Sequence, residues 1–275
     1  MNIGVDLGGT KIRAGIELNG LITKQNTTFL QQKESLSSTI DQLIELIRPL
    51  ISYSIQGIGI GVPSVVDTAK GIVYNVTNIE SWKEVALKDI LEKEFKLPTF
   101  VNNDVNCFTL GEHRFGLAKG FHSVVGITIG TGLGAGIIIN DQLYVGHNCG
   151  AGEIGLLPYL DKNFEYYVSN SFFETQFGVS ALANNEAAID GNSKALDIWA
   201  EFGRHLGAVI KAIMYVYDPE VIILGGSISN AYPYFKDTVF ESLNDFAFPE
   251  SLKRLKIFQS KNKNIAILGA AALNS

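Results

Sequence analysis

One short segment, TFVNNDVNCF at residues 99–108, combines strand-like and reactive character. It begins with an apolar run and then presents Asn102, Asn103 and Asp104 before apolar character resumes at Val105. Asn or Asp at such a position can cap a helix, because its side-chain oxygen accepts hydrogen bonds from free backbone N–H groups. The same position can instead deliver a carboxylate to a cleft, where it can take a proton from a hydroxyl group. Taken alone, this segment favours the cap.

Two glycine-rich turns offer a second kind of chemistry. They occur in VDLGGTK, residues 5–11, and in GTGLGAG, residues 130–136. Glycines let a backbone approach a ligand closely, and successive N–H groups can then bind an anion such as a phosphate. Neither turn is a Walker loop, because the chain has no G-x-x-x-x-G-K-[ST] pattern. The residues after GTGLGAG favour a strand and a hairpin, whereas a dinucleotide fingerprint requires a helix there.

The two segments that carry these turns resemble each other. Each has an apolar strand-like run, a glycine turn, a second alternating run and then an Asn-containing turn. When Gly9 is placed on Gly130, six residues are identical in one register: Gly9-Thr10 with Gly130-Thr131, Ala14-Gly15-Ile16 with Ala135-Gly136-Ile137, and Asn19 with Asn140. We therefore predict an internal duplication, with two glycine hairpins that face each other across a cleft and suit a polyphosphate.

Strand-like and helix-like segments alternate along the rest of the chain, which is typical of an α/β fold. We expect a helix over residues 35–51, a helix opened by a Ser81–Glu84 capping box and ending near Phe95, a strand in GIGIGV at 57–62, a helix over 198–217 and a strand in VIIL at 221–224. These elements must position the polar segment and the two turns.

Composition limits the class of protein. A chain of 275 residues can form one large domain or two modest domains around a cleft. The hydrophobic fraction of 46% and the charged fraction of 18% are ordinary for a globular protein. The net charge of −6 and the lack of a dense Lys/Arg cluster argue against nucleic acid as a partner.

Cysteine usage and hydropathy point to the cytoplasm. Two cysteines, Cys107 and Cys149, are too few for a disulfide framework or a Cys-rich zinc site, and we expect both to be packing residues. No apolar run reaches the roughly 18 residues of a membrane span, and no basic region precedes an apolar one at the N-terminus. We therefore expect no membrane partner.

With these segments in place, the chain resembles the ROK family of sugar kinases, in the actin/hexokinase-like ATPase superfamily. The resemblance runs nearly end to end, through VDLGGTK, GIGIGVPS, TNIESW, NNDVNCFTLGEHRFG, GTGLGAGI, GAGEIG, DPEVIILGGSIS and LGAAAL in family order. It implies an α/β fold of two actin-like (ribonuclease H-like) ATPase domains with a nucleotide and sugar cleft between them, commonly as a homodimer. We expect a small domain over residues 1–115, joined by a C-terminal helix at about 265–275, and a larger domain over 116–264.

The resemblance also implies residue roles. Asp104 would be the base that accepts a proton from a sugar hydroxyl during phosphoryl transfer from ATP. A position at a helix N-terminus would favour its ionised form, so we expect a low pKa. Asp6 would lie near Mg²⁺ and would contact it through water. The nucleotide-binding residues would be Asp6, Gly8, Gly9, Thr10 and Lys11 in the first phosphate loop, Gly130, Thr131, Gly132 and Gly134 in the second, and Gly225 and Gly226 beside the adenosine.

The implied sugar site departs from the family at one point. The matching sugar-binding residues are Asn78, Asn103, Asp104, Glu153 and Glu174. The family usually has a histidine after GEIG, which touches the sugar and binds a structural zinc with three cysteines before the later Glu. Here that position is Leu156, and residues 156–175 contain no cysteine or histidine. We therefore predict no zinc, with aromatic residues packing this region instead.

The leading hypothesis is an ATP- and Mg²⁺-dependent kinase that phosphorylates a hexose, at the 6-hydroxyl group. Leu156 motivates an alternative, an N-acylated amino-sugar kinase such as one for N-acetylmannosamine. A sugar-responsive transcriptional regulator is disfavoured, because Met1 leads directly into the first strand and no DNA-binding segment is evident. An actin-like assembly ATPase is disfavoured, because a filament has no evident task for the polar residues Asn103, Asp104, Glu153 and Glu174.

Overall fold

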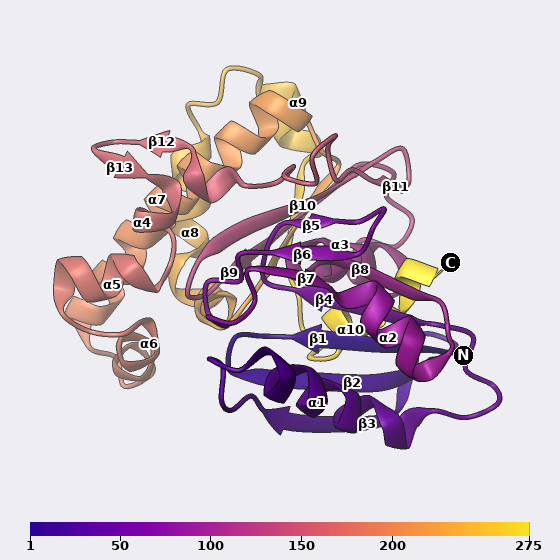
Figure 1. Cartoon of the computed structure of the whole chain (residues 1–275). Coiled ribbons are helices and arrows are strands. Elements are labelled where there is room, and N and C mark those ends of the chain that lie inside the picture. Colours follow the sequence, from indigo (N-terminus) through magenta and orange to yellow (C-terminus); the bar gives the residue numbers. More distant parts are fainter. Residues whose placement is uncertain (275) are drawn as a thin grey trace.

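Two five-stranded sheets form the framework of the chain. The structure is a computed structural model, and it describes residues 1–274 (Figure 1). The first sheet has the order β3-β2-β1-β4-β8 and the second β11-β10-β9-β14-β15. Their strands are β1 (Asn2–Leu7), β2 (Lys11–Leu18), β3 (Leu21–Phe29), β4 (Ile58–Val62) and β8 (Thr99–Asn103), and β9 (Val124–Ile129), β10 (Leu133–Ile139), β11 (Gln142–Leu143), β14 (Val221–Gly225) and β15 (Lys256–Gln259).

The two sheets repeat one pattern of pairing. β1 pairs antiparallel with β2 and parallel with β4, and β9 pairs antiparallel with β10 and parallel with β14. Asn19 and Asn140 adopt the same left-handed conformation, at φ 53° and 52°. The predicted strand–turn–strand unit therefore occurs in both sheets, and its origin by duplication stays a prediction.

Helices and small strands cover these sheets. The helices are α1 (Leu36–Ile47), α2 (Leu87–Phe95), α3 (Asp104–Phe115), α4 (Phe164–Tyr167), α5 (Asn170–Phe177), α6 (Ala181–Ile189), α7 (Ser193–Tyr217), α8 (Tyr232–Leu243), α9 (Pro249–Arg254) and α10 (Ile265–Ala271). Short 3₁₀ turns span Arg48–Leu50, Ile154–Leu156, Ile228–Ala231 and Ala272–Asn274. The remaining strands are β5 (Val66–Asp67), β6 (Ile72–Tyr74) and β7 (Glu84–Ala86), which form one small sheet, and β12 (Pro158–Tyr159) and β13 (Lys162–Asn163), which form another.

Helices α3 and α10 connect the two halves (Figure 1). α10 packs on β1 and β4, α3 packs on β9 and β10, and the two helices pack against each other. Their approach depends on glycine: a Cβ added to Gly269 would lie 1.7 Å from the Cys107 carbonyl oxygen, and one on Gly111 would lie 2.1 Å from that of Ile265. This close packing places the N-termini of both helices between the sheets.

Most expected elements are present, and one cap is wrong. The helix expected over 35–51 is α1, capped by Ser35 and followed by a 3₁₀ turn, and the long helix begins earlier than expected, at Ser193. Residues 84–86 form strand β7, so α2 begins only at Leu87 and the Ser81–Glu84 capping box does not exist. Instead, the Ser81 hydroxyl donates to the Lys33 carbonyl oxygen at 2.7 Å, which holds this loop to the segment before α1.

Each sheet has its own apolar core. The core of the first sheet includes Ile3, Leu43 and Trp82, and the core of the second includes Trp199 and Phe235, all fully buried. A third cluster, around Phe108, Val124 and Leu268, joins α3 and α10 to the second sheet. The domain limits of 1–115 and 116–264 stay a prediction, and Ser275 of the expected C-terminal helix lies outside the described residues.

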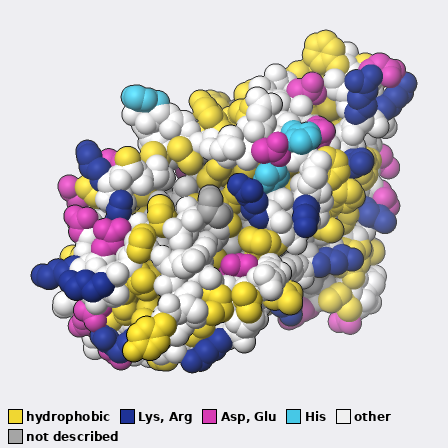
Figure 2. All heavy atoms as spheres, turned by 90° about the vertical axis from the view of Figure 1, so that its right-hand side faces the viewer, with side chains coloured by type: hydrophobic (Ala, Val, Ile, Leu, Met, Phe, Trp, Pro, Cys, Tyr) yellow, Lys and Arg dark blue, Asp and Glu magenta, His cyan; other side chains and the backbone are white. Residues whose placement is uncertain are grey.

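The surface carries mixed charge. On the face in Figure 2, Lys and Arg side chains are interspersed with acidic and hydrophobic ones. Over the described part of the chain, none of the helices combines the length and apolarity needed to cross a membrane.

Candidate active site

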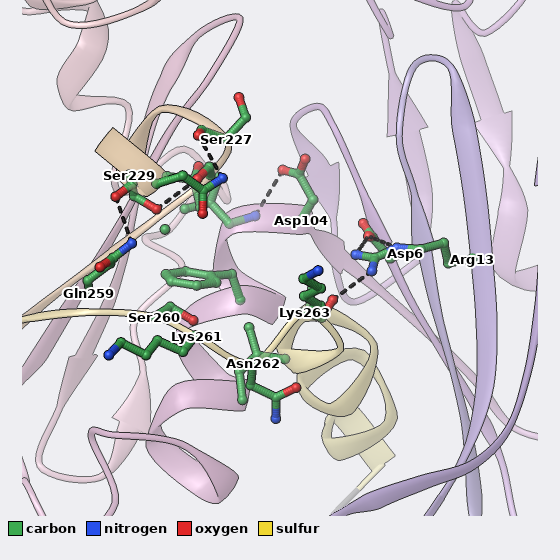
Figure 3. Close-up of a pocket in the computed structure, with 18 residues that line it drawn as sticks. Asp6, Arg13, Asp104, Ser227, Ser229, Gln259, Ser260, Lys261, Asn262 and Lys263 are labelled. Carbon is green, nitrogen blue, oxygen red and sulfur yellow. Dashed lines mark hydrogen bonds and ion pairs between the residues drawn. The ribbon is translucent and has the colours of Figure 1, made fainter. Parts of the chain in front are cut away.

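A cavity of about 780 Å³ opens between the two sheets (Figure 3). Both halves contribute to its walls: β1 and β2 on one side, the end of β14 on the other, and α3 with the start of α10 between them. The lining residues are Asp6, Arg13, Asp104, Val105, Phe108, Thr128, Gly225, Gly226, Ser227, Ser229, Asn230, Gln259, Ser260, Lys261, Asn262, Lys263, Ile265 and Ala266.

In the polar segment at residues 102–104, one residue caps a helix and the next lines the cavity. Asn103 is the N-cap of α3, and its side-chain oxygen accepts hydrogen bonds from the N–H groups of Val105 at 2.8 Å and Asn106 at 3.2 Å. Asp104 is the first residue of the helix, and its carboxyl group lines the cavity. Both interpretations of the segment therefore describe real features, but the cap is Asn103 and the cavity carboxyl is Asp104.

The proton affinity of Asp104 contradicts the expected low pKa. Burial raises the pKa of its carboxyl group to about 7, and the negative charges of Asp6 and, more weakly, Glu153 act in the same direction. The N–H of Val105, which donates to Asp104 Oδ1 at 2.9 Å, opposes the shift. Stabilisation by the helix N-terminus is thus outweighed by loss of solvent and by a neighbouring carboxylate. A carboxyl with this pKa is suited to general base chemistry near neutral pH.

Asp6 is held by an arginine that the sequence reasoning missed. Arg13 Nη2 lies 2.6 Å from Asp6 Oδ2, and Arg13 Nε donates to the same oxygen at 3.2 Å. The two residues are direct partners in the antiparallel β1–β2 register. A signal for this pair existed, because a hairpin with residues 9 and 10 at its turn sets residue 6 opposite residue 13.

This carboxylate pair fits a magnesium ion held mainly by phosphate and water. Asp6 and Asp104 line one cavity, and their oxygens are the ligand type that Mg²⁺ prefers. Arg13 already occupies Asp6 Oδ2, which favours a contact through water over direct coordination. Among residues 1–274, no group of three or more His, Cys, Asp or Glu side chains is arranged to hold a metal.

The predicted phosphate-binding residues fall into two sets. Asp6, Gly225 and Gly226 line the cavity itself. Each glycine hairpin is closed by a backbone hydrogen bond of 3.0 Å, from Gly8 N to Lys11 O in the first and from Gly130 N to Gly132 O in the second. The structure places Thr10 and Thr131 in the same turns. A Cβ on Gly130 would lie 3.5 Å from Ser227 Oγ, so the second hairpin adjoins the cavity wall. Gly134 follows in β10, where a Cβ would meet Val105 at 2.9 Å.

Several expected sugar-binding residues lie near the same region. Asn103 Nδ2 donates to the Ser64 carbonyl oxygen at 3.3 Å. Asn78 packs on the first hairpin, since a Cβ on Gly9 would lie 2.4 Å from the Asn78 Cβ. The Glu153 charge acts on Asp104, which places these two carboxyl groups within electrostatic reach of each other.

Glu165 joins this group, and Glu174 does not. Glu165 Oε2 accepts a hydrogen bond from Leu133 N at 2.9 Å, and its charge, after burial, raises the pKa of Glu153. Glu174 lies exposed on α5, one turn beyond the Asn170 N–H that donates to Gly130 O at 2.9 Å. The family cysteines that would mark the position of the later Glu are absent here, so the sequence held no landmark that separates the two acids.

Aromatic packing in the region after Leu156 is confirmed. Tyr159 stacks on Phe164 with ring centroids 4.6 Å apart. Phe172 and Phe173 are fully buried and in edge contact, with ring centroids 5.1 Å apart. Tyr166 and Tyr167 are in edge contact, with centroids 5.0 Å apart. Leu156 itself is 62% exposed. The lack of zinc stays a prediction, which metal analysis of the purified protein would test.

Comparison with known proteins identifies relatives over the whole chain. The ROK family matches residues 2–275. A glucokinase from Streptomyces coelicolor is 30% identical, over 88% of this chain and 86% of its own. A xylose repressor from Bacillus spizizenii is 28% identical, over 99% of this chain and 76% of the repressor. A solved ROK family glucokinase from Streptomyces griseus, in complex with glucose and AMPPNP, has a TM-score of 0.85 at 27% identity, covering 99% and 98% of the two chains. The expected α/β fold of the actin-like ATPase type is therefore confirmed.

Proposed function

This chain belongs to the ROK family, and from that premise we propose that it is a kinase that phosphorylates a hexose with ATP and Mg²⁺ at the primary 6-hydroxyl group. The observation that carries the proposal is the Asp104 carboxyl, with a pKa of about 7, in the wall of a cavity between the two sheets. The similarity to glucokinases supports a sugar as the acceptor. A cytoplasmic location, where ATP is abundant, and a homodimer are parts of the same proposal.

The proposed reaction is a direct transfer. The hydroxyl oxygen of the sugar forms a bond to the γ-phosphorus of ATP, and the bond from that phosphorus to the bridging oxygen breaks, so ADP leaves. The hydroxyl proton goes to a carboxyl oxygen of Asp104, which later releases it to water. Because phosphoryl transfer needs mainly positioning and charge stabilisation, a base that takes the proton late is sufficient.

The nucleotide would occupy the cavity with its phosphates toward Asp6 and Asp104. The backbone N–H groups of the two glycine hairpins, at residues 8–11 and 130–134, would bind the phosphates. Gly225 and Gly226 would lie beside the adenosine. When bound, Mg²⁺ would supply charge neutralisation on the phosphates, and Asp6 would hold it through water.

The sugar would be bound by a ring of amides and carboxylates. We propose Asn78, Asn103 and Glu153 for this role, with Glu165 in the place first expected of Glu174. Hydroxyl groups need paired donors and acceptors, since an unmatched buried polar group costs about 1–3 kcal/mol. The contact of Glu165 with Leu133 N would tie sugar binding to the second phosphate hairpin.

A second candidate is an N-acylated amino-sugar kinase. It is favoured by the exposed side chain of Leu156, at the position where the family resemblance implies a histidine that touches the sugar. An apolar side chain at that position could contact an acyl group that a histidine would exclude.

The test is a coupled assay of ADP release with glucose, fructose, mannose, glucosamine, N-acetylglucosamine and N-acetylmannosamine. We expect sugar-dependent turnover that Asp104→Asn lowers by about 10²- to 10⁴-fold while nucleotide binding is retained. Asp197→Asn, an exposed acid on α7, is the matched control and should behave as wild type. Sugar binding without turnover would favour a regulator, and sugar-independent hydrolysis unchanged by Asp104→Asn would favour an assembly ATPase.

A further inference from the structure

The segment between β15 and α10 brings two lysines to the cavity. Lys261 and Lys263 both line it, and neither belongs to the motifs that suggested phosphate binding. In Figure 3, the Lys263 side chain points toward the space between Asp104 and Asp6, whereas the Lys261 side chain points away from these acids. The two lysines thus differ in direction although only Asn262 separates them in the sequence.

Lys263 has a fixed backbone and a free ammonium group. Arg13 Nη1, from the other half of the molecule, donates to the Lys263 carbonyl oxygen at 2.6 Å. On either side, Asn264 N donates to Asn262 Oδ1 at 3.0 Å and Ile265 N donates to the Asn262 carbonyl oxygen at 3.1 Å. The Lys263 ammonium forms no ion pair with any acid among residues 1–274, whereas Asp6 is paired with Arg13.

The charges around this space favour a polyanion. Arg13 neutralises Asp6, and of the two lysines that line the cavity, Lys263 is the one that points toward Asp104 and Asp6. During phosphoryl transfer, negative charge spreads over the oxygens of the transferred group, and a lysine ammonium is a strong partner for such oxygens. Lys263 is exposed at the opening of the cavity, so its ammonium group is accessible to the phosphate of an entering ligand.

We propose that Lys263 is a phosphate-binding residue whose ammonium group contacts the terminal phosphate of the bound nucleoside triphosphate. This inference rests on the proposed kinase function and adds a residue to it. It assigns the β15–α10 segment a direct part in the reaction, since α10 and Arg13 together hold Lys263 opposite the base. A ligand without the terminal phosphate would not use this contact.

The test compares Lys263→Met with Lys263→Arg, Lys261→Met and Lys236→Met, the last an exposed lysine on α8. Binding of AMP, ADP and AMPPNP, each with Mg²⁺, is measured by titration calorimetry, and kcat and KM are measured with the best sugar. We expect Lys263→Met to weaken AMPPNP binding by about 10- to 100-fold and to leave AMP binding unchanged. Lys263→Arg should restore most of the loss, and Lys236→Met should match wild type.

Two results would overturn the inference while leaving the kinase function intact. One is wild-type AMPPNP affinity and turnover in Lys263→Met. The other is an equal loss for AMP and AMPPNP, or for Lys261→Met and Lys263→Met, because a general loss of positive charge would explain it. A wild-type protein that neither binds AMPPNP nor phosphorylates a sugar would overturn the proposed function, and this inference with it.

Discussion

Asp104 shows how the surroundings of one residue set its chemistry. A carboxylate at the start of a helix is normally stabilised in its charged form. Here burial and the charge of Asp6 outweigh that effect and raise the pKa of Asp104 to about 7. The residue can therefore exchange a proton near neutral pH, which a carboxylate with an ordinary pKa does poorly.

This pKa predicts how stability depends on pH in the absence of ligands. The folded protein keeps a proton on Asp104 up to about pH 7, whereas the unfolded chain loses it near pH 3.8. The free energy of unfolding should therefore fall as pH rises from about 4 to about 7. The Asp104→Asn variant has no carboxyl to ionise, so its free energy of unfolding should not fall in this way. At pH 8 the variant should therefore be more stable than wild type by roughly 1–3 kcal/mol, and at pH 4 the difference should nearly vanish. Thermal melts at both pH values check this, with Asp197→Asn as control, and a variant no more stable than wild type at pH 8 would refute the raised pKa.

A second prediction separates two glutamates of one segment. Glu165→Gln should raise the KM for the sugar by about 10-fold or more, because it removes a charged partner of the Glu153 region and alters the contact with Leu133 N. Glu174→Gln, on the exposed side of α5, should leave kcat and KM unchanged. Steady-state kinetics with the preferred sugar provides the measurement. The reverse outcome would restore the original assignment of Glu174.

At the scale of elements, the pairing of α3 with α10 decides where the site lies. α3 presents Asp104 at its first residue, and α10 follows the segment that presents Lys263. The helices cross at Gly111 and Gly269, where side chains would collide with backbone oxygens. A loss of this contact would move both cavity residues at once.

Gly269→Ala should therefore destabilise the protein strongly. Its new methyl group would lie 1.7 Å from the Cys107 carbonyl oxygen, a backbone atom that cannot move without shifting α3. We expect a loss of about 2–4 kcal/mol in urea denaturation, together with reduced turnover. Gly150→Ala is the matched control for stability, because a Cβ there meets no heavy atom of the described chain within 4 Å. Equal stability of the two variants would show that the helices can separate without cost.

At the scale of the whole molecule, the two halves also touch away from the cavity. Thr68 lies between β5 and β6, and Cys149 lies in the loop that precedes Glu153. The distance from Thr68 Oγ1 to Cys149 Sγ is 3.5 Å. This contact joins the small sheet of the N-terminal half to the loop that carries a proposed sugar-binding residue. Relative movement of the halves would break it.

A disulfide across this contact should lock the halves together. Thr68→Cys, under mild oxidation, should cross-link to Cys149, because the two side-chain ends are nearly in bonding range. We expect sugar-dependent turnover to be lost on oxidation and to return with a reductant, since sugar must enter between the halves. Thr68→Ser, and Thr68→Cys combined with Cys149→Ser, should show neither effect. Full turnover of the cross-linked protein would mean that sugar enters without separation at this point.

The sequence predicted the parts of this protein that local patterns encode. Apolar and alternating runs predicted strands β1, β2, β4, β8, β9, β10 and β14, and the repeated Gly-Thr and Ala-Gly-Ile residues predicted the similarity of the two hairpins. The same reasoning failed at Ser81 and Glu84, because a hydrogen bond from Ser81 to distant Lys33 replaced the local cap.

The features of the site that the sequence did not predict depend on residues brought together from distant parts of the chain. Local patterns in the sequence were sufficient for the α/β class and the glycine turns, because strand alternation and turn chemistry are local properties, and its ordered motifs were sufficient for the family. Only the tertiary structure decided the proton affinity of Asp104, the contact from Arg13 to Lys263 and the grouping of Glu165 with Glu153. Burial and electrostatic interaction depend on distance in space, and the chain positions of these residues do not specify those distances.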